Sequence, residues 1–179
     1  MALIVTIAGS PSHPSRSSLL ADLVGTRLSA AGFEVEPINV RDLPAEDLLH
    51  GRPESPRLQA ALGLIERAQG VVVCTPVYKA SFTGVLKTFL DLLPQLGLTG
   101  KVVLPLVTGG TTAHVLVIDY ALRPVLASLN PLHVTTGLFL LDKLCERPPQ
   151  GGLVLEPELA RRLDGVVDEF ARAVRRVHS

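Results

Sequence analysis

The sequence predicts an α/β fold, a five-stranded doubly wound parallel sheet with helices on both faces. Three observations support this prediction. Short apolar runs rich in β-branched residues recur along the chain, segments of helical periodicity separate them, and no internal repeat or low-complexity linker interrupts the alternation. Strands that alternate with helices at this spacing need right-handed crossovers, which place helices on both sides of a parallel sheet.

The first expected strand, residues 3–8, is apolar on both of its faces. A strand covered by helices on both sides has this pattern. Residues 71–75 and 102–107 repeat it, residues 35–40 are a weaker version, and residues 134–141 form the expected last strand. Together these runs account for the five strands of the sheet.

The closing helix, residues 157–177, has the clearest helical pattern. Apolar residues such as Leu159, Leu163 and Phe170 recur on one side, while arginines and acids occupy the other. One face is therefore expected to dock on the sheet and one to meet water. The other expected helices are residues 17–31, 55–68, 84–93 and 112–129.

The length of 179 residues fits one domain of this class, so residues 1–179 are expected to form a single domain. Apolar residues make up 47% of the chain and charged residues only 19%. Such a balance leaves few charges to cover the outside of a monomer. We therefore expect a homo-oligomer, a dimer that pairs into a tetramer.

The charge balance narrows the choice of partners. Seventeen basic and seventeen acidic residues cancel, and no basic run occurs. This favours a small molecule or another protein over nucleic acid or a membrane surface. The first apolar run is too short to span a bilayer, and no cleavable leader pattern opens the chain. We expect a cytoplasmic protein in which Cys74 and Cys145 stay reduced and carry no chemistry.

Ligands of a doubly wound sheet bind beyond the carboxyl ends of the strands, where the strand order reverses. The first loop at that edge, residues 9–18, combines many hydroxyls with one guanidinium at a helix start. Unpaired N–H groups and a partial positive charge at that start attract phosphate, and an arginine strengthens the site. The alternative is a plain helix cap, which needs only one of these serines. The candidate phosphate-binding residues are Ser10, Ser15, Arg16, Ser17 and Ser18.

The next two loops at this edge suit a flat ring system. Tyr78 and Lys79 follow a strand end directly, and the two glycines of the third loop let backbone amides approach a heterocycle closely. The alternative for Tyr78 and Lys79 is a solvated loop. The candidate ring-binding residues are Pro76, Val77, Tyr78, Lys79, Thr108, Gly109, Gly110 and Thr111.

Side chains that could carry a reaction by themselves are not evident in the sequence. The histidines show no metal-ligand spacing, and neither a catalytic carboxylate pair nor a nucleophile elbow stands out. Neither GxGxxG nor GxxxxGK[ST] occurs, which argues against a fingerprint dinucleotide fold and a P-loop NTPase. These observations favour a bound cofactor that supplies the chemistry.

At these three loops the sequence resembles the NADPH-dependent FMN reductase family, and within it the alkanesulfonate-assimilation enzymes that pass reduced flavin to a separate monooxygenase. The resemblance runs through roughly the first 130 residues, and the segment 132–152 adds nothing to it. The matching stretches are residues 8–11 with 14–18, 45–49, 75–80, 84–88 with 91–94, 100–106, 108–111 and 119–126.

The resemblance implies a flavodoxin-like fold and hydride transfer from NADPH to FMN. The first loop would hold the FMN phosphate, and the loops around Tyr78 and Gly109 would hold the isoalloxazine. Many relatives carry an arginine where Ser12 stands, so the phosphate here would depend more on Arg16 and the hydroxyls. The flavin-dependent monooxygenase is the expected protein partner.

Tyr120 is the most specific feature of the resemblance. In the sulfonate-linked members, a tyrosine at this point resembles an insertion that makes a π-bulge at a tetramer contact and keeps flavin loosely held. The local sequence independently supports a disturbed helix at this point, because Pro124 has no N–H to bond to the carbonyl of Tyr120. The apolar side chains of residues 113–129 predict a helix buried nearly all round, as at a subunit interface. The alternative is a tyrosine in a kinked core helix.

Two other functions stay open at this stage. One is an FMN-retaining quinone or azo reductase, which reduced flavin appearing free in solution would exclude. The other is a non-catalytic electron carrier of flavodoxin type, which the neutral charge balance disfavours. The choice between NADPH and NADH is also open.

Overall fold

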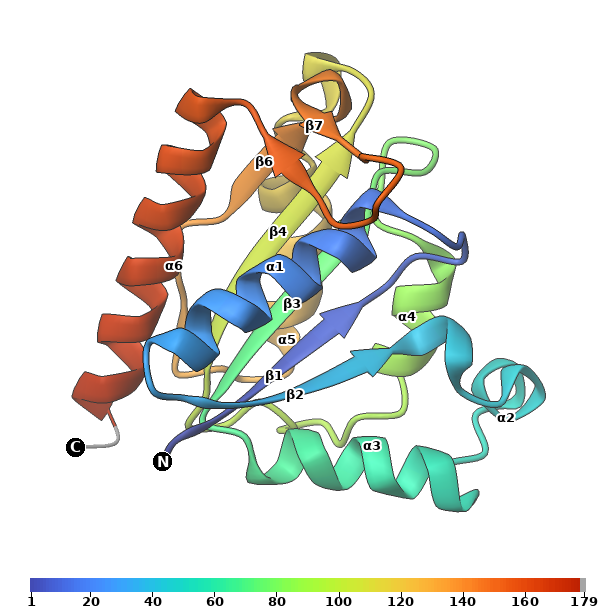
Figure 1. The fold of residues 1–179 in the computed structure, drawn as a ribbon. Coiled ribbons are helices and arrows are strands. Elements are labelled where there is room, and N and C mark those ends of the chain that lie inside the picture. The colour runs from blue at the N-terminus through green and yellow to red at the C-terminus, as the bar shows by residue number, and fades with distance from the viewer. Residues whose placement is uncertain (178–179) are drawn as a thin grey trace.

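The computed structural model describes residues 1–177 and centres on a parallel sheet (Figure 1). Its longest strands are β1 (Leu3–Ala8), β2 (Glu34–Asn39), β3 (Gly70–Pro76) and β4 (Val102–Gly109). The sheet has the order β2-β1-β3-β4-β5, which reverses direction between β1 and β3. The predicted flavodoxin-like doubly wound fold is confirmed. Residues 178–179 of the expected domain lie outside the described residues.

The fifth position of the sheet differs from the prediction. Residues 134–141 were expected to form one strand, but two short strands, β5 (His133–Val134) and β6 (Leu138–Leu141), pair parallel to β4. The interruption lies beside Pro105 of β4, which lacks the N–H that a ladder requires. Gly137 fits there because a Cβ would lie 2.8 Å from the Pro105 carbonyl oxygen.

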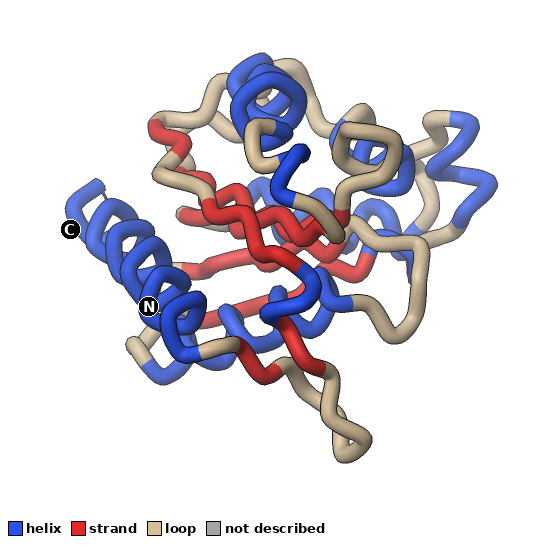
Figure 2. The backbone as a smooth tube through the Cα atoms, turned by 90° about the horizontal axis from the view of Figure 1, so that it is seen from above, coloured by secondary structure: helices blue, strands red, loops and turns tan. Residues whose placement is uncertain are grey.

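Helices cover both faces of the sheet, as predicted (Figures 1 and 2). Helices α1 (Arg16–Ala30) and α6 (Pro157–Val177) pack on one face. Helices α3 (Pro56–Arg67), α4 (Gly84–Leu90) and α5 (Arg123–Ser128) pack on the other. Helix α4 ends at Leu90, earlier than the expected residue 93. Beyond it, the N–H groups of Leu92 and Leu93 bond to carbonyls three residues back, in place of the four of an α-helix.

Several smaller elements were not predicted. Helix α2 (Ala45–His50) follows β2, and an antiparallel pair, β7 (Cys145–Glu146) and β8 (Val154–Leu155), precedes α6. The loop after β7 passes beside the start of α1 (Figure 1), where Arg147 donates a hydrogen bond to the Pro14 carbonyl. This arrangement brings a late segment of the chain to the carboxyl edge of the sheet.

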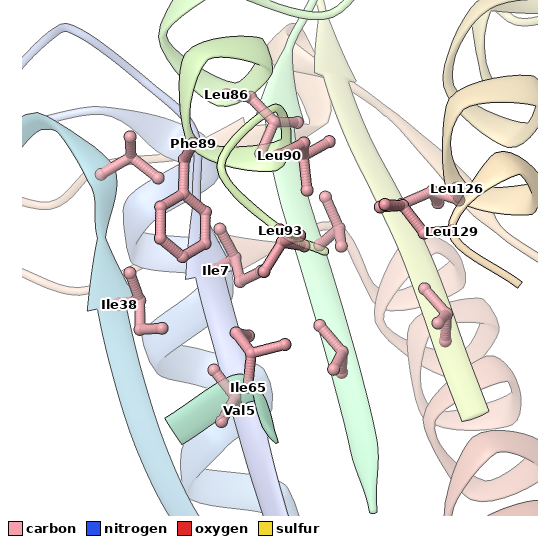
Figure 3. Close-up of a cluster of buried hydrophobic side chains, with 14 of the residues drawn as sticks. Val5, Ile7, Ile38, Ile65, Leu86, Phe89, Leu90, Leu93, Leu126 and Leu129 are labelled. Atoms are coloured by element: carbon pink, nitrogen blue, oxygen red, sulfur yellow. The ribbon is translucent and has the colours of Figure 1, made fainter. Parts of the chain in front are cut away.

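The sheet separates two hydrophobic clusters. Val5 and Ile7 of β1 face the cluster under α3, α4 and α5, whereas Ile4 and Ala8 face the one under α1 and α6. This alternation is what a strand buried on both sides requires. Phe89 of α4 is fully buried above the sheet, close to Ile7 (Figure 3). Burial of such a side chain stabilises the fold by roughly 2 to 3 kcal/mol.

The expected helix over residues 112–129 is divided into shorter pieces. It contains a 3-10 turn, Thr112–His114, a π-helical turn, Ile118–Leu122, and α5. The N–H of Arg123 bonds to the carbonyl of Ile118, five residues earlier. The next residue, Pro124, has no N–H to restore the regular pattern. The disturbance expected at Tyr120 is therefore present as a π-helical turn.

Candidate functional site

The predicted loops meet at a cavity of about 310 Å³ beyond the carboxyl ends of β1, β3 and β4. Side chains from all three loops line it. The predicted residues in the lining are Ser10, Ser15, Arg16, Ser17, Pro76, Tyr78 and Thr108. The other lining residues are Ser12, Pro14, Asp142 and Arg147. A doubly wound sheet places ligands at this edge because the crossovers from its central strands leave in opposite directions there.

Hydroxyls gather at the start of α1. Ser15 is the N-cap and its Oγ accepts a 3.0 Å hydrogen bond from the N–H of Ser18. The Ser15 hydroxyl also lies 3.2 Å from that of Ser17 and donates to that of Ser18 at 2.9 Å. Ser18 therefore supports the cap and does not line the cavity. The first N–H groups of the helix have no intrahelical partner, which suits this end to an anion.

The loop after β3 makes a tight two-residue turn. Tyr78 and Ser81 exchange backbone hydrogen bonds of 2.8 and 3.1 Å, while Lys79 and Ala80 between them have φ of +51° and +61°. Left-handed geometry at two consecutive non-glycine residues is costly and is typical of functional loops. The turn leaves Tyr78 half-exposed at the cavity, where its hydroxyl lies 3.1 Å from that of Ser12.

Two predicted residues of this loop lie away from the cavity. The Val77 side chain packs against the hydrophobic cluster of α3, α4 and α5, and its N–H bonds to the Thr108 carbonyl at 2.9 Å. Lys79 is exposed at the tip of the turn. The alternation of side chains at the strand end explains Val77, because Pro76 and Tyr78 on either side of it take the cavity positions.

The third loop contributes the Thr108 side chain to the cavity lining. Gly109 is the last residue of β4, and Gly110 and Thr111 follow it. A Cβ on Gly109 would lie 2.7 Å from Cζ of Phe139, so a side chain at this position would require that ring to shift. A Cβ on Gly110 would meet only the Asp142 carboxylate, at 4.0 Å. Thr111 caps the following 3-10 turn by accepting from the N–H of Ala113.

Tyr120 lies outside the cavity lining but is bonded to the second loop. Its side chain is half-exposed, and its hydroxyl donates a 2.7 Å hydrogen bond to the Ala80 carbonyl. Val115 and Leu116 nearby in the chain are 50% and 62% exposed. The prediction that this helix is buried nearly all round is therefore wrong within one chain, because only the sheet-facing side chains such as Ile118 and Leu122 are covered.

Asp142 and Arg147 are site residues that sequence reasoning missed. Both belong to segment 142–147, which no motif or resemblance singled out. Arg147 reaches the first loop across 133 positions, and its guanidinium donates a 3.0 Å hydrogen bond to the Pro14 carbonyl. Such a contact leaves no periodic or local signal in one sequence.

Both thiols are buried. Burial raises the pKa of Cys145 to about 11; nearby Asp142 also raises it and Arg16 lowers it. Burial, with a smaller effect of Asp22, also raises the pKa of Cys74. Protonated thiols are poor nucleophiles at neutral pH.

A larger hollow of about 480 Å³ lies at the opposite end of the strands, between α3 and the segment that precedes β4. Leucines form much of its lining. Its lysine, Lys101, is buried, and the ammonium donates 2.9 Å hydrogen bonds to the carbonyls of Glu66 and Ala68. These bonds are structural, and the amino end of a parallel sheet is not where ligands of this fold bind.

Within residues 1–177, no group of three His, Cys, Asp or Glu side chains is arranged to hold a metal ion. Among the helices of the same residues, none combines the length and apolar character needed to cross a membrane.

Known proteins share the sequence pattern and the fold of this chain. A family model described as NADPH-dependent FMN reductase matches residues 2–144. An FMN reductase (NADPH) of Escherichia coli K12 is 44% identical over 176 residues, covering 97% of this chain and 90% of that protein. One from Pseudomonas putida is 51% identical over 140 residues, covering 78% and 71%. The apo crystal structure of the NADH:FMN oxidoreductase EMOB superimposes with a TM-score of 0.89 at 39% identity, covering 97% and 90%. The chain belongs to the NADPH-dependent FMN reductase family.

Proposed function

We propose that this protein reduces FMN with NADPH and releases the reduced flavin to a flavin-dependent monooxygenase of sulfonate-sulfur assimilation. The single observation that carries the proposal is the cavity at the carboxyl ends of β1, β3 and β4. It joins a hydroxyl-rich, capped helix start with Arg16 to the Tyr78 turn and Thr108. A phosphate bound at the first end would leave the ring of the same molecule beside the second.

The residues present fit FMN. Ser10, Ser15, Ser17 and Arg16 offer the hydroxyl and guanidinium donors that a phosphate accepts from. We assign the isoalloxazine to Pro76, Tyr78 and Thr108, with backbone of Gly109 to Thr111 and the Lys79 turn at its edge. FMN supplies the redox chemistry when bound, and these side chains bind and orient it.

Release of the flavin is assigned to the region around Tyr120. The Tyr120 hydroxyl is bonded to Ala80 in the same turn as Tyr78, so the π-helical turn and the ring-binding loop are mechanically joined. Val115, Leu116 and Tyr120 form an exposed apolar patch beside it. We assign this patch to the contact between subunits of a dimer that pairs into a tetramer.

The test is steady-state oxidation of NADPH with and without added FMN, together with the absorbance of the protein as purified. A colourless protein with saturable dependence on FMN supports flavin as an exchangeable substrate. Under anaerobic conditions, reduced FMN should then pass through a membrane that retains the protein. A yellow protein that oxidises NADPH without added FMN and reduces a quinone would instead indicate an FMN-retaining reductase.

A further inference from the structure

The start of α1 and the segment after β6 hold each other through two exchanged hydrogen bonds. The Arg16 Nε donates to the carbonyl of Cys145 at 3.0 Å, and an Nη of Arg147 donates to the carbonyl of Pro14 at 3.0 Å. Each arginine thus bonds to the backbone two residues before the other arginine. As Figure 1 shows, the loop after β7 runs beside the first turn of α1.

The exchange brings both guanidiniums to the cavity that holds the serines of the first loop. Asp142 is the acidic side chain in the same lining, so Arg16 and Arg147 together leave an excess of positive charge there. A guanidinium has five N–H donors, and the backbone bond uses one of them on each arginine. The remaining donors suit the several oxygens of a phosphate.

Arg147 is anchored at the phosphate end of the cavity. Its partner Pro14 directly precedes Ser15, the N-cap of α1. A phosphate at the helix start would therefore lie between Arg16 on the helix and Arg147 on the facing segment.

Resting on the proposed function, we propose that Arg147 is a second phosphate-binding residue for FMN. It acts with Arg16, and the bound phosphate fixes segment 142–147 against the start of α1. The β7 segment is then part of the flavin site, although it lies outside the loops at the ends of the central strands. Riboflavin, which has no phosphate, would leave that segment held by the two exchanged hydrogen bonds alone.

The experiment compares FMN and riboflavin binding by fluorescence titration in the parent, Arg147→Ala and Arg147→Lys proteins. Arg172→Ala, which removes an exposed arginine on α6, is the matched control. We expect Arg147→Ala to weaken FMN binding about tenfold to a hundredfold, as for a lost charge-assisted hydrogen bond, and to change riboflavin binding less than about twofold. Lysine should restore part of the loss, and the control should bind both flavins like the parent.

Hydrogen exchange supplies a readout that is independent of activity. FMN, but not riboflavin, should slow amide exchange in segment 142–147 of the parent, and Arg147→Ala should abolish the difference. If Arg147→Ala weakens the binding of FMN and of riboflavin equally, Arg147 only holds the two segments together, and the proposal is overturned. If Arg147→Ala leaves FMN affinity unchanged but raises the KM for NADPH, Arg147 binds a phosphate of NADPH, and the proposal is overturned. A parent protein that binds FMN and riboflavin equally would instead defeat the phosphate site of the proposed function.

Discussion

The phenolic hydroxyl of Tyr120 donates a 2.7 Å hydrogen bond to the backbone carbonyl of Ala80, 40 positions earlier in the chain. The bond joins the π-helical turn Ile118–Leu122 to the turn that carries Tyr78. Ala80 is itself held at a φ of +61°. The geometry of the π-helical turn therefore sets where one side of the ring-binding loop is anchored.

Deletion of Tyr120 is expected to change flavin release. Removing one residue lets the bond from Arg123 to Ile118 shorten its span from five residues to four, so the helix can become regular. The deletion protein should purify with FMN bound and lose turnover of free flavin, while it still accepts a hydride from the nicotinamide. Flavin absorbance after purification and NADPH oxidation with added FMN are the measurements.

Tyr120→Phe tests the role of the hydroxyl separately from the role of the extra residue in the π-helical turn. It keeps the chain length and the ring but removes the bond to Ala80, so it should purify colourless like the parent and lose at most about 1.5 kcal/mol of unfolding free energy. A colourless deletion protein that turns over FMN normally would make Tyr120 an ordinary surface residue of a kinked helix.

Arg16→Ala should weaken FMN binding by about 1.5 to 3 kcal/mol, because a charge-assisted bond to the phosphate is lost. Riboflavin affinity should change much less. Fluorescence titration with both flavins measures these two affinities. Arg16→Lys should retain part of the FMN affinity, because lysine keeps the positive charge. A change of only a few tenths of a kcal/mol would mean that the bond to Cys145 is the whole role of Arg16.

Ala80→Gly should stabilise the protein by about 0.5 to 1 kcal/mol. A non-glycine residue in left-handed geometry costs about 1 to 2 kcal/mol, and the extra freedom of glycine in the unfolded chain offsets about 0.5 to 1 of that. Ala60→Gly is the matched control, because Ala60 is exposed in the interior of α3. This substitution should lower the free energy of unfolding by about 1 kcal/mol. Chemical denaturation of both variants checks the opposite signs.

Both thiols should resist alkylation at pH 8 in the folded protein. With its pKa raised from 9.0 to about 11, Cys145 carries about one thiolate per thousand molecules at that pH. Modification should accelerate as the pH rises toward the raised pKa and become fast after unfolding. Mass spectrometry of iodoacetamide-treated native and urea-unfolded samples measures this, and rapid native labelling at pH 8 would contradict the buried placement.

Leu116→Glu should dissociate the proposed oligomer, because a charge on the exposed patch with Val115 and Tyr120 would be buried between subunits. Light scattering at micromolar concentration should show a larger assembly for the parent and smaller particles for the variant. Leu132→Glu is the control, since Leu132 is also exposed but precedes β5 at the far end of the sheet. A monomeric parent would exclude the interface.

Sequence alone determined the elements whose causes are local. The apolar runs of β1, β3 and β4 and the one-sided periodicity of α6 fix their type, because each must bury those faces. The cluster of hydroxyls at Ser15 identified the capped helix start. Pro124 indicated the irregular helix. Its missing N–H removes one intrahelical hydrogen bond, and this loss does not depend on what the helix packs against.

Only the tertiary structure decided which distant segments meet. The split of the fifth strand depends on Pro105 in its neighbour, and the bond from Tyr120 to Ala80 depends on how two loops pack. Arg147 joined the cavity because the β7 segment lies across the start of α1. These contacts join residues more than 30 positions apart in the sequence. They depend on how the chain packs, and the local periodicity of one sequence does not predict them.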